Sequence, residues 1–129
     1  MMYSSLDEFL KQQKVLLAKG PVALIFVEDD VEVATTLRHH LQSGFAAVVA
    51  LMPDAFDLPR DIKNKIHRVP FDCSAPERTF QAINQVIAAA DPGCWLYYCY
   101  NAEFLFFPFC ETRSVAEMLA FHSEERRSA

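Results

Sequence analysis

Two continuous apolar runs of strand length, residues 22–27 (VALIFV) and 45–52 (FAAVVALM), constrain the fold of this chain most. Runs without polar alternation are typical of parallel strands that are buried on both faces. A shorter strand is predicted at Lys65–Phe71, and a fourth, rich in aromatic residues, at Trp95–Glu103. Most of the segments between these strands show apolar residues at helical spacing. Strands that alternate with helices predict a mostly parallel sheet with helices on both faces, a three-layer α/β/α sandwich.

The helix signals agree with this order. Ser5 with Glu8 three residues later forms a capping box, and Gly20-Pro21 ends the first helix. Asp29 or Asp30 is expected to cap a second helix that runs to about residue 43. The other helical segments are predicted over residues 74–90 and 112–126, with a short helical turn or loop over 62–66.

Length and charge limit the classes of function. The 129 residues form one domain, and we expect it to be the front part of a longer protein, the alternative being a complete small domain. A net charge of -5 without a clustered basic stripe gives no support to a nucleic-acid partner. Neither a bilayer-spanning run nor a signal peptide is visible, so we expect a cytoplasmic protein.

Without a CxxC pair, the cysteines are expected to be buried thiols rather than zinc ligands: Cys73, Cys94, Cys99 and Cys110.

Candidate site residues follow the predicted strands, because ligands of open α/β sheets bind outside the carboxyl ends of the strands. Glu28 and Asp29 follow the first strand, where acids either cap the next helix or bind a divalent cation or a nucleotide. Asp54 follows the second strand, as a turn residue or a pocket residue. Asn101 and Glu103 end the fourth strand. The histidines are expected to have no catalytic role: His39, His40, His67 and His122.

Asn84 is a further candidate. It lies in the middle of a predicted helix, where asparagine has poor propensity. Its side chain therefore either faces solvent or reaches the ligand pocket, and the sequence leaves both alternatives open.

Several short motifs, taken in their order and spacing, resemble glycosyltransferase family 2 proteins of the GT-A fold. The acidic segment Val27-Glu28-Asp29, the His40–Phe45 sequence HLQSGF and the helical Asn84 are similar to features of a bacterial group with an N-terminal nucleotide-sugar half. The Tyr100–Phe104 sequence YNAEF is similar to that family's Asp-x-Asp-Glu-Phe motif. The resemblance covers nearly the whole chain and implies a Rossmann-like fold, the nucleotide-binding half of GT-A.

The resemblance implies transfer of a sugar from a nucleotide diphosphate to an acceptor. Because Tyr100 and Ala102 replace the metal-binding aspartates, the resemblance leaves three alternatives open: a transferase with a weakened metal site, a metal-independent one, or an inactive relative that binds nucleotide. The family's acceptor-binding half is not in these residues, so we do not expect this chain alone to transfer sugar. The residues implied for nucleotide binding are Glu28, Asp29, Asp54 and Asn84, and those implied for the diphosphate or a Mn²⁺ or Mg²⁺ ion are Asn101 and Glu103.

A second resemblance, which we rank lower, is to response-regulator receiver domains. Residues 24–41 look like the receiver's opening strand, acidic pair and first helix, and Asp72 falls near the phospho-accepting position. Phe107-Pro108-Phe109 is similar to the receiver's Lys-Pro-Phe, with Phe107 in place of the lysine. This alternative implies a signalling or interaction domain with strand order 2-1-3-4-5. A third alternative is a structural fragment that forms a homodimer through a sheet edge or the last helix.

Overall fold

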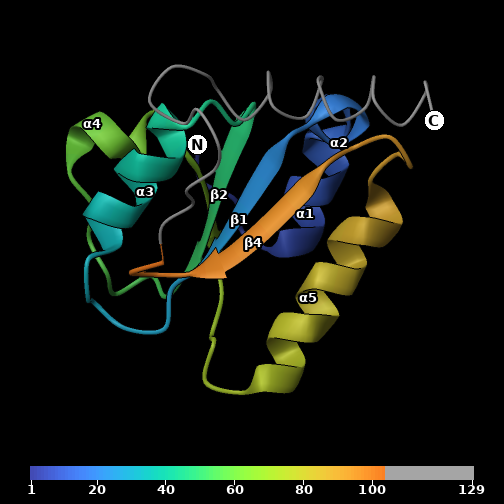
Figure 1. Cartoon of the computed structure of the whole chain (residues 1–129). Helices are drawn as coiled ribbons and strands as arrows, with labels where there is room; N and C mark the ends of the chain where they lie inside the picture. Colours follow the sequence, from blue (N-terminus) through green and yellow to red (C-terminus); the bar gives the residue numbers. More distant parts are fainter. Residues whose placement is uncertain (104–129) are drawn as a thin grey trace.

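Four parallel strands form the centre of the protein in a computed structural model that describes residues 1–103 (Figure 1). The sheet has the order β3-β2-β1-β4, and every neighbouring pair is parallel. The α/β fold with a mostly parallel sheet is therefore confirmed. The predictions for residues 104–129, including the last helix, lie outside the described residues. The strands are β1 (Val22–Phe26), β2 (Ala47–Met52), β3 (His67–Pro70) and β4 (Leu96–Tyr100).

The helices differ from the sequence prediction at three places, one of which is the short helical turn expected over 62–66, which lies at Arg60–Lys63. The predicted first helix is two helices, which meet at Gln13, where the backbone leaves the helical conformation (φ −112°, ψ 41°). The predicted cap by Ser5 is confirmed, because Ser5 Oγ accepts a hydrogen bond from Glu8 N at 3.2 Å. The capping box is not complete, because the Glu8 carboxylate accepts from Ser4 N, at 3.0 Å, rather than from Ser5 N. The third helix begins after Glu32, which makes no side-chain cap, so the prediction that Asp29 or Asp30 caps it is wrong. The helices are α1 (Leu6–Gln12), α2 (Lys14–Lys19), α3 (Val33–Gln42), α4 (Arg60–Lys63) and α5 (Pro76–Ala89).

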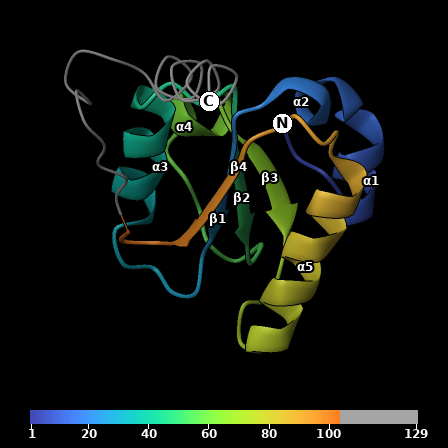
Figure 2. The ribbon, with the colours of Figure 1, turned by 45° about the vertical axis from the view of Figure 1, so that its right-hand side comes forward.

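Helices cover both faces of the sheet (Figure 2). Alternate residues of β1 point to opposite sides, so Leu24 packs with α1, α2 and α5, whereas Ile25 packs with α3 and α4. All residues of β1 and β2 are buried. Burial on both faces explains why these two strands are continuous apolar runs in the sequence.

The strand order differs from that of a receiver domain. A receiver has the order 2-1-3-4-5, in which the third strand lies beside the first. Here β3 lies beside β2, and β1 lies between β2 and β4. This order is that of the first four strands of a dinucleotide-binding sheet, 3-2-1-4-5-6. No helix in the described part of the chain is long and apolar enough to cross a membrane.

Candidate functional site

The candidate site lies where the chain direction across the sheet reverses. From β1 the chain passes to β2 and β3 on one side, whereas β4 is added on the other side of β1. In open α/β sheets, ligands bind outside the carboxyl ends of the strands at this switch point. The loop that follows β1 and the turn that follows β4, residues 101–103, meet there.

Asn101 holds these two segments together. Its side-chain oxygen accepts a hydrogen bond from Glu28 N at 2.9 Å. Its amide nitrogen donates to Asp29 Oδ1 at 2.6 Å and to Val31 O at 2.9 Å. The amide oxygen and both amide hydrogens thus have partners within the protein, so Asn101 positions the loop and has no spare donor for a ligand.

The turn after β4 is closed by its own residues and by α3. Glu103 Oε1 accepts a hydrogen bond from Tyr100 N at 2.7 Å, which directs this carboxylate back toward the strand. Ala102 has a left-handed conformation (φ 66°), and its N–H donates to Thr36 Oγ1 at 2.8 Å. Thr36 is a site residue that the sequence analysis missed, because nothing in the helix pattern distinguishes it.

The loop between β3 and α5 reaches the same edge of the sheet. Burial, together with the nearby charges of Glu28 and Asp72, raises the pKa of the Cys73 thiol to about 11. Hydrogen bonds from Ser74 hold the pKa of Asp72 below its ordinary value. The exposed Glu28 carboxylate therefore lies in an acidic surrounding that favours ligand hydroxyl and N–H donors over a closely placed diphosphate.

The structure does not bring all the predicted site residues together. Glu28, Asp29 and Asn101 contact one another at the switch point, and Glu103 lies in the adjoining turn. Asp54 lies beyond β2, apart from these residues, and lines a cavity that also contains Arg68. Asn84 is exposed on α5, so the solvent-facing alternative describes its position.

The residues in the described range do not fit a Mn²⁺ or Mg²⁺ ion. Among residues 1–103, no group of three or more His, Cys, Asp or Glu side chains is placed to hold a metal. Asn101, the amide expected to face the ion, is fully hydrogen-bonded. We therefore derive no chemical step through a metal.

Comparison of the chain with family models, with curated proteins and with solved structures gave no significant match.

Proposed function

We propose that this domain binds a nucleotide diphosphate sugar at the carboxyl ends of β1 and β4, as the nucleotide-binding half of a family 2-like glycosyltransferase. The single observation that supports this proposal best is the Asn101 clamp, which holds the loop after β1 against the turn after β4. The clamp lies at the switch point of a sheet with the dinucleotide-binding strand order.

The acids of the loop suit the nucleoside end of such a ligand. The Glu28 side chain is exposed, so its carboxylate is free to accept hydrogen bonds from ribose hydroxyls or from a base N–H. Asp29 is held by Asn101 and by the N–H of Val31, which fixes the direction of its remaining acceptor sites. We propose nucleotide binding, and not the sugar-transfer step itself, for the residues of this site.

Calorimetry with UDP, GDP and their sugars, each with and without Mn²⁺, tests the proposal. The Glu28→Ala variant is informative because the clamp uses the backbone N–H of Glu28, which alanine retains. We expect saturable binding that Glu28→Ala weakens by about tenfold, equivalent to about 1.4 kcal/mol. The matched control is Asp91→Ala, which removes the same charge from an exposed position before β4, at the opposite edge of the sheet.

Two results would contradict the proposal. One is the absence of binding to any of these ligands at millimolar concentration. The other is binding that Glu28→Ala and Asp91→Ala leave equally unchanged.

A further inference from the structure

Arg68 is a buried cation near the edge of the sheet, away from the switch point. It lies in β3, beside the N-terminal segment, and its backbone forms two hydrogen bonds with that segment. Arg68 N donates to Met1 O at 2.8 Å, and Arg68 O accepts from Tyr3 N at 3.0 Å. Only 7% of the residue is exposed. Residues 65–71 (KIHRVPF) contain Lys65 and His67 besides Arg68, so nothing in the sequence distinguishes Arg68 as the buried one.

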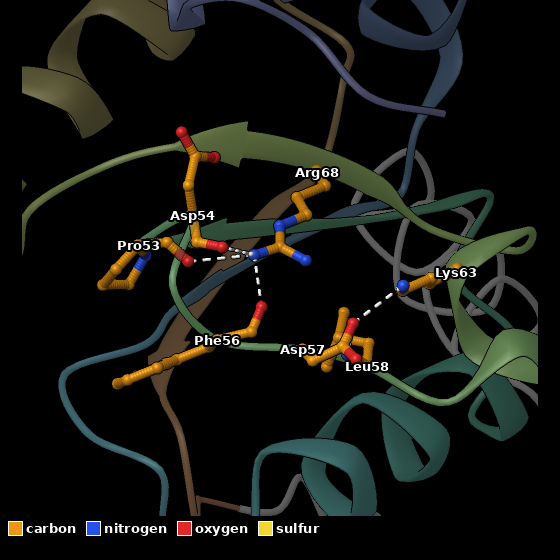
Figure 3. Close-up of polar contacts among 7 residues, drawn as sticks. All are labelled: Pro53, Asp54, Phe56, Asp57, Leu58, Lys63 and Arg68. Carbon is orange, nitrogen blue, oxygen red and sulfur yellow. Dashed lines mark hydrogen bonds and ion pairs between the residues drawn. The ribbon is translucent and has the colours of Figure 1, made fainter.

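The side chain of Arg68 is only partly satisfied (Figure 3). One terminal nitrogen, Nη2, donates to the carbonyl oxygens of Pro53 at 2.9 Å, Asp54 at 3.3 Å and Phe56. The buried Nε has no hydrogen-bond partner. The other terminal nitrogen, Nη1, points away from the three carbonyls and bonds to none of the described residues. The guanidinium therefore keeps two unpartnered nitrogens, Nη1 and an Nε that is itself closed off from solvent.

No carboxylate of the described residues pairs with this charge. The Asp54 carboxylate points away from the guanidinium, which contacts only its backbone oxygen (Figure 3). Asp57 forms its ion pair with Lys63, at 2.8 Å between Oδ1 and Nζ, and this contact, with a smaller contribution from the charge of Arg68, holds the pKa of Asp57 below its ordinary value. A buried charge without a counter-ion in direct contact is unfavourable, and carbonyl dipoles offset only part of that penalty.

A cavity of about 770 Å³ opens beside Arg68. This volume is in the range of small-molecule binding sites. Its lining contains buried Arg68 together with Lys63, and also two aspartates, Asp54 and Asp57, of which Asp57 is paired with Lys63. Met1 and Met2 in the lining are exposed although apolar. The apolar members of the lining include Met1, Met2, Phe56, Leu58 and Ile66.

We infer that this cavity, the Arg68 pocket, binds a small organic anion, a carboxylate or phosphate attached to an apolar body. The oxyanion accepts hydrogen bonds from Nη1 of Arg68 and lies close enough to the guanidinium to offset the charge at the buried Nε, and the apolar body contacts the methionine and phenylalanine side chains. This site is separate from the proposed nucleotide site, because the lining of the pocket includes neither Glu28 nor Asn101.

Titration followed by two-dimensional ¹H–¹⁵N NMR of arginine side chains tests the inference directly. The probes are inorganic phosphate, phenyl phosphate and benzoate, with sodium chloride at equal ionic strength as the control. We expect a saturable shift of the Arg68 Nε–H signal, and the organic probe with the better-matched oxyanion identifies the ligand class. Absence of a saturable shift with all three probes at about 10 mM would overturn the inference, because millimolar affinity would be visible there.

Three variants test whether the anion binds in this pocket. Asp57→Asn frees Lys63 from its ion pair and is expected to tighten binding about two- to fivefold. Asp61→Asn is the matched control, since Asp61 pairs with Arg38 and does not line the pocket. Arg68→Lys, if folded by circular dichroism, should weaken binding about tenfold or more, because lysine lacks the planar donor fork.

Equal binding by folded Arg68→Lys and the parent protein, or equal effects of the two aspartate variants, would also contradict the inference. Glu28→Ala is expected to leave binding at the Arg68 pocket unchanged. Failure of this proposal is therefore distinguishable from failure of the nucleotide proposal.

Discussion

At the scale of single residues, His40 connects the packing of α3 to the pH dependence of stability. The side chain is fully buried, and its ring lies 5.6 Å from that of Tyr97 between centroids. Nδ1 lies 2.8 Å from Thr36 O, a carbonyl that can only accept, so Nδ1 carries the proton. Nε2 is then an acceptor for the thiol of Cys99, at 3.7 Å from its sulfur. The neutral imidazole thus fits its site and the imidazolium does not.

Burial lowers the pKa of His40 below its ordinary value of 6.5, and the nearby His39 lowers it further. Because the unfolded chain binds this proton more readily, the contribution to stability is present above 6.5 and is lost as the pH falls toward the lower folded-state pKa. We expect the free energy of unfolding in urea to decrease between about pH 8 and about pH 5, and His40→Phe to reduce that decrease. Burial also lowers the pKa of His67, so part of the dependence should remain. An unchanged pH slope in His40→Phe would contradict this assignment.

Two glycines give a residue-scale test of the packing between α2 and β4. Gly20 has a φ of 58°, and a Cβ there would lie 2.9 Å from Trp95 O and 2.8 Å from Cys94 Sγ. A Cβ on Gly93 would meet nothing within 4 Å. We expect Gly20→Ala to lose about 2–3 kcal/mol of stability, and Gly93→Ala to change it by less than about 1 kcal/mol. Thermal unfolding of both variants measures the difference, and equal melting temperatures would be inconsistent with this geometry.

At the scale of elements, the Asn101 clamp joins the ends of two strands that are far apart in the sequence. Asn101→Ala removes three side-chain hydrogen bonds, one of them to the Asp29 carboxylate. Because the site is exposed, we expect a loss of about 1–2 kcal/mol in urea unfolding. Asn84→Ala is the control, since Asn84 is exposed within α5 and alanine has the higher helix propensity. A loss in Asn84→Ala as large as that in Asn101→Ala would show that the clamp has no special role.

The strands could be predicted from local sequence, whereas the details of the helices could not. The apolar runs 22–27 and 45–52 contain β1 and β2 because burial on both faces requires apolar side chains at every position. The break at Gln13 coincides with a hydrogen bond from its side chain to Tyr3 OH at 2.8 Å, a tertiary contact that helical spacing does not reveal. The predicted cap of α3 was wrong, because the Asp29 carboxylate accepts hydrogen bonds from Val31 N and from the Asn101 amide rather than capping the helix.

The same distinction applies to the candidate site. The rule that strands of a parallel sheet end at one edge brought Glu28, Asp29, Asp54 and Asn101 into one prediction, but Asp54 lies apart from the other three, in the cavity that contains Arg68. The hydrogen bonds of Asn101 could not be predicted, because two of its partners are backbone atoms of a loop about 70 residues earlier. The groups that accept hydrogen bonds from Arg68 are backbone carbonyls as well, and the type of a residue says little about where its carbonyl points.

At the scale of the whole molecule, β1 couples the two faces of the sheet. Leu24 belongs to the cluster with α1, α2 and α5, and Ile25 belongs to the cluster with α3 and α4. Both side chains are fully buried in one strand that pairs with β2 and β4. Loss of packing on either face should therefore loosen the whole sheet rather than one layer.

Hydrogen exchange followed by mass spectrometry tests this coupling. In the parent protein we expect the slowest exchange in β1 and β2, which are buried throughout, and faster exchange in β4, most of which is only half-buried. Leu24→Ala and Ile25→Ala should each lower stability by about 2–5 kcal/mol. Because the strand is shared, each should also speed exchange in the helices of both faces, α3 as well as α5. Faster exchange confined to the helices on the substituted face would mean that the two layers open independently and that β1 does not couple them.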